Sequence, residues 1–326
     1  MRPFWFSRSS SSILLLALLL RLYVHAKVSL ARAPVSRTIT HSHRVTVDRR
    51  GRGDFRTVQS AVDFVPDVNR NWIKIHVNAG SYWSVLLLPY FCCARRRSPF
   101  PARKRYILLE GAGSSSRTGI SFNAHTRAGI DQIMRRPNVS LDDELSPTFR
   151  SATFTVLSDN FVARRASPSS SGDTLCDFRG RHYFHFRRCL VRGGVDFVFG
   201  YERQSMYEDC ALVSTMPPGP QPRWVTAHAR LDAGSPSGLV FKGGAVTGTS
   251  RIYLGRAWNG YATVVFYGTR MDSVVVPQGW QAWNFNFRFQ VTCVTFAEVG
   301  CTGRGSEVKR FVDRKFIDDG WLLTQP

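Results

Sequence analysis

The sequence Phe186-Arg187-Arg188-Cys189-Leu190-Val191 is followed by a similar stretch, Tyr207-Glu208-Asp209-Cys210-Ala211-Leu212. Each stretch begins with an aromatic residue, continues with polar or small residues and ends in an apolar pair. Looser copies begin at Phe161, Phe241 and Phe266. Short strands that recur at intervals of roughly 20–50 residues predict a β-solenoid, in which each coil stacks on the next. The competing architecture is a β-sandwich or barrel, whose strands usually recur about every 8–12 residues.

A short helix is expected before these strands. In residues 54–65, Phe55, Val58, Val62 and Val65 recur at helical spacing, and Pro66 ends the pattern. The fold class predicted from the residues is therefore all-β, with one short helix near the amino terminus.

The amino-terminal residues are typical of a secretion signal. Arg2 and Arg8 precede an apolar run over residues 13–20, and Ala26 offers a small residue for cleavage. An uncleaved anchor is the alternative, but the run is shorter than the roughly 18–20 apolar residues that a membrane helix needs. We expect a signal peptide over residues 1–26, an exposed lead-in over 27–44 and one domain over 45–326. The cleaved protein would be secreted and free of the membrane.

Charge and cysteine content restrict the partners and the chemistry. The formal net charge of +21 favours a polyanionic partner, and an acidic polysaccharide and a nucleic acid both qualify. None of the seven cysteines lies in a CxxC pair, which disfavours a zinc site. One or two disulfides are plausible in an oxidising compartment, although the sequence leaves their pairing open. A conventional serine esterase is disfavoured because the chain has no Gly-x-Ser-x-Gly segment.

Two aspartates have a spacing that suits catalysis. Asp173 precedes Thr174-Leu175, and Asp196 lies in the segment GVDFVFG of residues 194–200. In the predicted solenoid the interval between them is one coil, so the two carboxylates would stand side by side on one face. Neighbouring carboxylates do not both ionise easily, and such a pair can supply one acid and one nucleophile. Two unrelated turn aspartates would give the same pattern.

The segments around these aspartates resemble the central signature of plant pectinesterases. Further similar segments follow in the order of that family: residues 226–230 (TAHAR), 253–258 (YLGRAW) and 276–280 (VPQGW), with residues 45–48 and 76–82 upstream. The resemblance runs from about Val45 to near the carboxyl terminus. It implies a right-handed parallel β-helix, in agreement with the repeat.

The resemblance also implies a role for individual residues. Asp196 would attack the methyl-ester carbonyl of a galacturonate unit, and Asp173 would protonate the departing methanol and then activate water. Arg256 would hold the Asp196 carboxylate ionised and correctly oriented. Trp258 would stack on a sugar ring. No metal and no organic cofactor is expected, since these side chains supply the chemistry.

The chain departs from the family pattern at several places. Gly172 stands where the family has a glutamine before the acid aspartate, and Cys176 stands where an aromatic is frequent. The resemblance implies that this glutamine and a second one upstream donate to the oxyanion formed during attack, so their absence predicts reduced activity. An upstream coil that carries a second glutamine has no recognisable counterpart, so we expect a deletion near residues 164–172. Residues 89–104, with Cys92-Cys93, read as an insertion. An error in deriving the protein from its gene and a diverged, poorly hydrolysing paralogue both fit these departures.

The function predicted from the sequence is removal of methyl esters from homogalacturonan, the pectin backbone, in cell wall modification. The expected protein is a secreted, extracellular monomer of the cell wall, with pectin and a proteinaceous pectinesterase inhibitor as its partners. The alternative is a catalytically impaired pectin-binding wall protein. A nucleic-acid partner is disfavoured by the secretion signal and by the absence of a recognition module.

Overall fold

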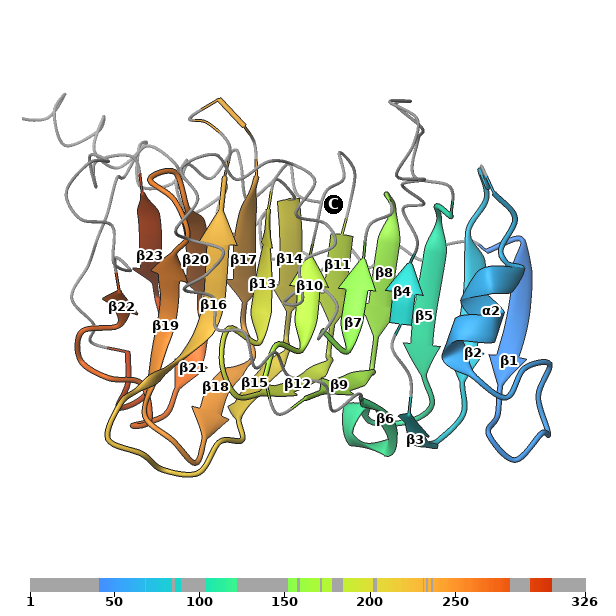
Figure 1. Cartoon of the computed structure of the whole chain (residues 1–326), viewed down its shortest axis with the longest axis horizontal. Coiled ribbons are helices and arrows are strands. Elements are labelled where there is room, and N and C mark those ends of the chain that lie inside the picture. The colour runs from blue at the N-terminus through green and yellow to red at the C-terminus, as the bar shows by residue number, and fades with distance from the viewer. Residues whose placement is uncertain are drawn as a thin grey trace, which may run out of the picture. The chain divides into compact units, whose positions relative to one another are not determined.

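Short parallel strands build nearly all of the fold, as the aromatic repeat predicts. The computed structural model describes residues 41–67, 69–83, 86–88, 104–121, 152–156, 159–170, 172–177, 184–201, 204–230, 232, 234–235, 237–281 and 294–306. From β2 onward, the chain visits three parallel sheets in a fixed order, so each strand pairs with the strands three places before and after it (Figure 1). This is the arrangement of a parallel β-helix.

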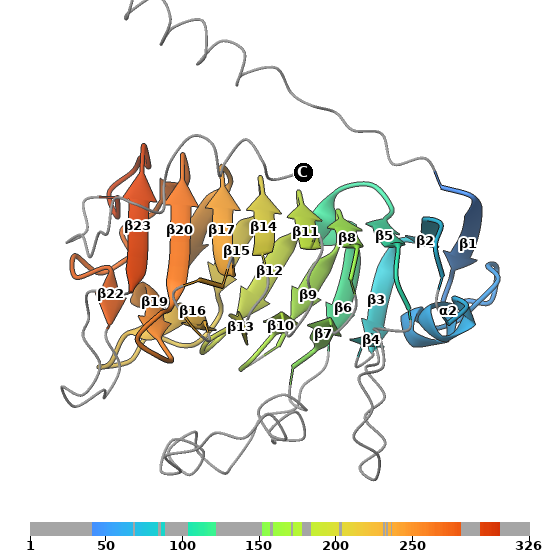
Figure 2. The ribbon, with the colours of Figure 1, turned by 90° about the horizontal axis from the view of Figure 1, so that it is seen from above.

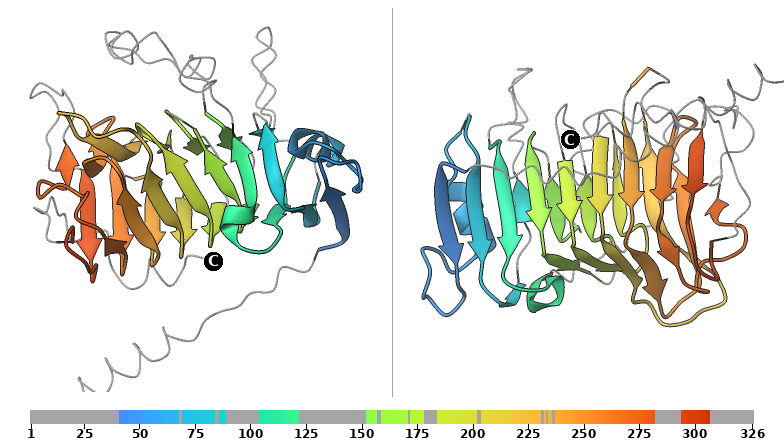
Figure 3. Two further views of the ribbon diagram at one scale, coloured as in Figure 1. Left: turned by 90° about the horizontal axis from the view of Figure 1, so that it is seen from below. Right: turned by 180° about the vertical axis from the view of Figure 1, so that it is seen from behind.

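Sheet A has the strand order β1 (His43–Val47), β2 (Ile73–Val77), β5 (Ile107–Gly111), β8 (Phe161–Arg164), β11 (Phe184–Arg187), β14 (Gln204–Glu208), β17 (Gly238–Lys242), β20 (Thr263–Tyr267) and β23 (Thr295–Val299). Sheet B consists of β3 (Gly80–Trp83), β6 (Thr118–Ser121), β9 (Ser167–Ser169), β12 (Leu190–Gly193), β15 (Ala211–Ser214), β18 (Ala245–Gly248) and β21 (Arg270–Met271). Sheet C consists of β4 (Leu86–Leu88), β7 (Phe154–Val156), β10 (Leu175–Asp177), β13 (Val198–Tyr201), β16 (Arg223–Ala229), β19 (Ile252–Ala257) and β22 (Trp280–Gln281). Figure 2 shows each sheet running in chain order from blue to red, and the views of Figure 3 show the same stacking from below and behind.

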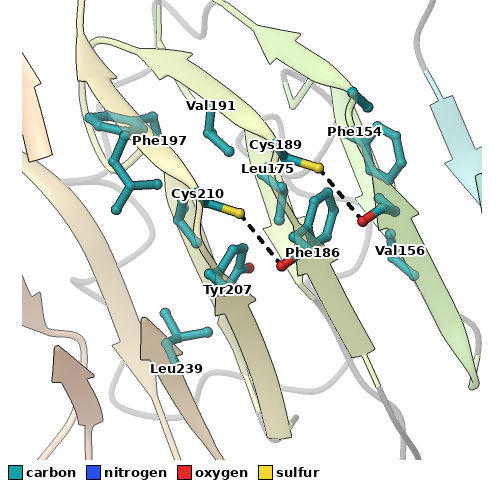
Figure 4. Packing of buried hydrophobic residues seen from close by; sticks show 14 of the residues in the cluster. Phe154, Val156, Leu175, Phe186, Cys189, Val191, Phe197, Tyr207, Cys210 and Leu239 are labelled. Carbon is teal, nitrogen blue, oxygen red and sulfur yellow. Dashed lines mark hydrogen bonds between the residues drawn. The ribbon is translucent and has the colours of Figure 1, made fainter. Parts of the chain in front are cut away.

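The aromatic repeat is a ladder in the core of sheet A. Phe186 pairs with Tyr207, Tyr207 with Phe241, and Phe241 with Phe266 in the strand register. Their rings stack, with centroids 5.4, 4.6 and 4.4 Å apart. Stacking of like residues on successive coils is what a parallel β-helix requires of its interior. Figure 4 shows Phe186 and Tyr207 beside Leu175 and Phe154 in this core.

The first copy of the repeat is out of register with the others. Phe161 pairs with Phe184, and Phe186 pairs with Ala163. This coil is therefore slightly shorter than the repeat predicted, since the repeat aligned Phe161 with Phe186. An aromatic residue at both Phe184 and Phe186 made the sequence alignment of this copy ambiguous.

A left-handed residue follows each of six consecutive sheet A strands from β8 to β23, and after β17 a second one, Gly244, follows it. The φ values are 53° at Arg165, 51° at Arg188, 52° at Asp209, 67° at Gly243, 60° at Gly268 and 59° at Gly300. In five of these coils the amide of this residue donates to the carbonyl of the last strand residue in the next coil, at 2.8–3.1 Å. The repeated corner directs the chain from sheet A to sheet B. Glycine takes this conformation freely, whereas an L side chain is strained by it.

The predicted helix is shorter than its apolar pattern. Helix α2 spans Val58–Phe64 and buries Val58, Ala61 and Val62. It begins at Val58 because the Thr57 side chain accepts a hydrogen bond from the Ser60 amide at 3.1 Å. Phe55 therefore lies outside the helix and bridges to Val47 of β1. A 3₁₀ turn, η1 (Ser115–Arg117), completes the helical elements of the described residues.

The solenoid runs without a break across residues 164–172, where a deletion relative to the family pattern is predicted. All three sheets are continuous there: β8 pairs directly with β11, β7 with β10, and β9 with β12. The strand β9 lies inside the supposed gap and pairs with β6 of the preceding coil. One complete coil lies between Phe161 and Phe184. Neighbouring coils would pair in this way with or without a lost coil, so the deletion stays a prediction.

Several predicted features lie outside the described residues. These are the signal peptide over 1–26, residues 27–40 of the lead-in and residues 89–103 of the insertion. The first described strand, β1, begins at His43. No helix in the part of the chain that the structure describes is long and apolar enough to cross a membrane.

No disulfide joins any two of the four described cysteines. Cys176, Cys189 and Cys210 are buried, and Cys301 is half-buried. Cys189 and Cys210 donate to the carbonyls of Ala163 and Phe186 at 3.6 and 3.5 Å (Figure 4). These two thiols therefore serve as small core side chains at equivalent positions of neighbouring coils.

Candidate active site

Asp173 and Asp196 occupy equivalent positions in neighbouring coils. Strands β10 and β13 pair with Leu175 opposite Val198, and each aspartate lies two positions before the paired residue of its strand. The sequence separation between Asp173 and Asp196 therefore equals the separation between the paired residues Leu175 and Val198. Asp196 is fully buried, and Asp173 is 8% exposed. The parallel register brings these two carboxyl-bearing residues to the same edge of sheet C.

Asp196 has a left-handed backbone, with φ at 46°. Such a conformation is uncommon for a residue other than glycine, and it recurs at functional sites where surrounding contacts enforce it. Here the Asp196 amide donates to the carbonyl of Trp224 in the next coil at 2.9 Å. The bond anchors the turn that presents the Asp196 side chain.

Arg256, on β19, holds the Asp196 carboxylate from 60 residues away in sequence. Its Nε donates to Oδ1 at 2.9 Å, and its Nη2 donates to Oδ2. The pair is bidentate, which is the strongest geometry available to an arginine and a carboxylate. Only the stacking of β13, β16 and β19 brings the two residues together.

The electrostatics of Asp196 reflect two opposing effects. Burial raises the pKa of the Asp196 carboxyl above its ordinary value, while the charge and hydrogen bonds of Arg256 lower it. The guanidinium stays charged at any ordinary pH, so the carboxylate always has a cationic partner. A buried carboxylate of raised pKa is more basic, and hence more nucleophilic, than one in water.

Aromatic side chains lie on or directly beside the strands of sheet C that stack to form this ion pair, β13, β16 and β19. Trp258 contacts Phe199 and Tyr201 of β13, with ring centroids 5.6 and 5.2 Å away. Trp224 stacks on Tyr253, with centroids 6.1 Å apart and planes inclined by 16°. Trp258 is only partly buried. Such flat apolar surfaces suit the faces of sugar rings.

Comparison with known proteins identifies the chain. The family model described as Pectinesterase matches residues 154–318. Probable pectinesterase 29 of Arabidopsis thaliana is 33% identical over 312 residues, which cover 83% of this chain and 82% of that protein. The chain belongs to the pectinesterase family. Putative pectinesterase 10 of the same plant is 32% identical, with 83% of this chain and 84% of that protein covered. A probable pectinesterase/pectinesterase inhibitor of Arabidopsis thaliana is 28% identical and is covered over 46% of its length, against 80% of this chain.

Solved structures agree on the fold. A pectin methylesterase from carrot has a TM-score of 0.57 and 23% identity, with 83% of this chain and 85% of that chain covered. A pectin methylesterase mutant in complex with a hexasaccharide has a TM-score of 0.56 and 18% identity, with 88% and 95% covered. These likenesses confirm the right-handed parallel β-helix. The family and the fold support a carboxylic ester hydrolase that acts on methyl-esterified pectin.

Two departures from the pectinesterase pattern lie close to the aspartates. Gly172 precedes Asp173, and a Cβ built on it would meet no atom within 4 Å. Cys176 is fully buried in a small cluster with Ala152, Phe199 and Ala227, against which Tyr201 and Trp258 pack. The Cys176 thiol is thus part of the apolar cluster that supports Tyr201 and Trp258 of the candidate site.

Trp224 is the site residue that the sequence did not reveal. It lies in the coil after Asp196, which is lengthened by the connection between β15 and β16. Its register with Tyr253 and its contact with Asp196 are visible only after the coils are stacked. The neighbouring TAHAR segment could have drawn attention to it. In the ranges that the structure describes, no three His, Cys, Asp or Glu residues cluster as metal ligands would.

Proposed function

We propose that this protein hydrolyses the methyl esters of homogalacturonan, releasing methanol and leaving free galacturonate. The observation that carries the proposal is the Asp196–Arg256 ion pair beside Asp173 in a chain of the pectinesterase family. Two carboxyl groups in adjacent coils, one of them paired with an arginine, suit a reaction that needs one nucleophile and one acid.

The first half of the reaction forms an acyl-enzyme. A carboxylate oxygen of Asp196 attacks the ester carbonyl carbon, and the carbonyl electrons move onto oxygen in a tetrahedral intermediate. When this collapses, the bond to the methoxy oxygen breaks and Asp173, in its acid form, donates a proton to the departing methanol. An anhydride then joins Asp196 to the galacturonate carbonyl.

The second half restores the enzyme. Asp173, now ionised, takes a proton from water, whose oxygen attacks the galacturonate carbonyl. The anhydride bond breaks, galacturonic acid leaves and loses its remaining proton to solvent, and Asp196 returns to its ion pair. Arg256 orients the nucleophile at both ends of this cycle and keeps it ionised against the effect of burial. No metal or organic cofactor takes part in these steps.

Substrate binding is proposed for the aromatic residues beside the ion pair. Trp258, half-buried and backed by Phe199 and Tyr201, would stack on one galacturonate ring. A related fold was solved with a hexasaccharide, which supports binding of an extended sugar chain. The net charge of +21 would attract a polymer that carries free carboxylates.

The cellular setting is also a proposal. The amino-terminal pattern of residues 1–26 and family membership support secretion to the cell wall, where pectin modification takes place. The protein would act as a monomer. A relative whose name joins a pectinesterase to a pectinesterase inhibitor supports an inhibitor protein as a further partner.

Methanol release from highly methylated pectin tests the proposal directly. The purified chain would be compared with Asp196→Asn, Asp173→Asn and Asp209→Asn. Asp209 is the matched control, because it is an exposed aspartate with the same left-handed backbone, φ 52°, on another face of the coil. We expect loss of turnover in the first two variants and unchanged turnover in the third.

Two results would speak against the esterase. Equal activity in all four proteins would assign the turnover to other residues or to a contaminant. A folded wild-type chain that binds homogalacturonan but releases no methanol would favour the pectin-binding wall protein instead.

A further inference from the structure

We propose that Trp224 is a positioning residue that holds the Arg256 guanidinium against Asp196 through the face of its indole ring. The inference rests on the proposed roles of Asp196 and Arg256. In this arrangement Trp224, one coil before Arg256, orients the arginine, and the arginine in turn orients the proposed nucleophile Asp196.

The contact itself is close. The Arg256 Cζ lies 4.0 Å from the centroid of the Trp224 ring, within the range of a cation–π interaction. Trp is the strongest aromatic partner for such a contact, and the interaction grows when the cation is removed from water. Arg256 is only 8% exposed, so its guanidinium is largely desolvated.

Trp224 also contacts the other member of the ion pair. Its backbone carbonyl accepts the Asp196 amide at 2.9 Å and so fixes the left-handed turn at Asp196. One residue therefore contacts both groups, with its main chain on the aspartate and its ring on the arginine. The two contacts use different atoms, so a side-chain substitution removes the second and spares the first.

The ring is itself held in place. Trp224 pairs with Tyr253 in the register of β16 and β19, and the two rings stack with planes inclined by 16°. The indole Nε1 is buried and has no hydrogen-bond partner among the described residues. The contacts of the Trp224 ring with Tyr253 and with the Arg256 guanidinium favour a positioning role.

The cation–π contact gains its value from geometry. Arg256 must present two donors to two carboxylate oxygens at once, and a long arginine side chain loses rotamer freedom to do so. A flat ring against the guanidinium removes most of the competing orientations. Without it, we expect the bidentate pair to exchange with single-bonded or detached states, in which Asp196 is misaligned for attack.

Nuclear magnetic resonance of the arginine Nε–H groups tests the contact without relying on turnover. In the wild-type chain the Arg256 Nε–H should be shifted upfield by the indole ring and protected from exchange by its bond to Asp196. Arg256→Lys identifies the resonance by its loss. In Trp224→Leu we expect the upfield shift to vanish and exchange to quicken, whereas Trp224→Phe should keep part of the shift.

Kinetics on methylated pectin provides the second measurement. We expect kcat to fall about 5- to 30-fold in Trp224→Leu, with KM changed less than about threefold, and to recover largely in Trp224→Phe. Trp72→Leu, which removes a tryptophan that contacts Tyr106 in a distant coil, is the control for loss of an aromatic residue. Its kcat should match the wild type.

Two results would overturn the inference. One is an Arg256 Nε–H resonance that is unchanged in Trp224→Leu, whatever the activity. The other is a rise of KM with constant kcat, which would make Trp224 a substrate-stacking residue. If the wild-type chain releases no methanol, the proposed function fails, while the resonance still decides whether Trp224 positions Arg256.

Discussion

Removing the guanidinium from Arg256 should make folding stability depend on pH in a predictable way. In Arg256→Gln, the fully buried Asp196 carboxylate loses its cationic partner. Breaking a buried pair by removing one member typically costs about 3–5 kcal/mol. The carboxyl can avoid part of this cost by taking up a proton, so the full loss should be seen only where it stays ionised.

The sign follows from proton linkage. Burial already raises the pKa of Asp196, and loss of Arg256 removes the effects that lower it. The folded variant therefore binds a proton that the unfolded chain, with its ordinary pKa near 3.8, has released. Its stability is fully present below that value and falls as pH rises, by up to about 1.4 kcal/mol per pH unit, until the folded carboxyl ionises.

Urea unfolding followed by tryptophan fluorescence measures this effect. The wild type, Arg256→Gln, Asp196→Asn and the double variant would be compared at several pH values from about 5 to 8. The double variant buries no unpaired charge, so it should recover most of the stability lost in Arg256→Gln and lose the pH dependence. A deficit in Arg256→Gln that is constant across this range, or a double variant with the summed losses of the single ones, would refute the reasoning.

Three further changes probe separate parts of the molecule. Gly172→Gln places an amide beside Asp173, where a Cβ meets no atom within 4 Å. If the missing oxyanion donor limits turnover, methanol release should rise about 100-fold, with Gly172→Ala unchanged. His228 is buried, and burial lowers its pKa to about 3, so below about pH 6.5 the unfolded chain binds a proton that the folded chain does not. The free energy of unfolding of the wild type, measured in urea, should therefore fall by about 1.4 kcal/mol per pH unit below about pH 6.5, relative to that of His228→Gln. Gly268→Ala should lower the free energy of thermal unfolding by about 1 kcal/mol because φ is 60°, although an added Cβ meets no atom within 4 Å. Gly219→Ala is the control: its Cβ also meets no atom, but its φ is not positive, so it should cost less than about 0.5 kcal/mol.

The spacing argument for the aspartates succeeded because of a property of parallel coils. Leu175 of β10 pairs with Val198 of β13, and the same offset separates Asp173 from Asp196 in the sequence. Where the connections are short, the interval between two residues directly counts one turn of the solenoid. Strand pairing does not decide the deletion predicted near residues 164–172, because coils on either side of a lost coil would also stack on each other, as β8 does on β11.

The helix boundary shows how a local contact can limit a periodic pattern. Phe55 and Val58 share the helical spacing, but the Thr57 side chain caps the amide of Ser60 and begins the helix after Phe55. Phe55 then joins the β structure through its bridge to Val47, at the end of β1. Apolar periodicity indicated a helix correctly, whereas its start depended on a capping bond.

The sequence by itself determined the all-β solenoid and the one-coil interval between the two aspartates, because aromatic and acidic residues recur at the length of a coil. Its collinear motifs, such as TAHAR and YLGRAW, determined the family. The tertiary structure decided what surrounds Asp196. Arg256 reaches it from two coils away, and Trp224 contacts both members of the ion pair. These contacts depend on side-chain direction and on coils of unequal length, since Val198 pairs with Leu175 in the coil before it and with Thr226 in the longer coil after it. The sequence repeat contains neither the direction of the side chains nor the difference in coil length. The distance between two side chains is set only when the coils stack.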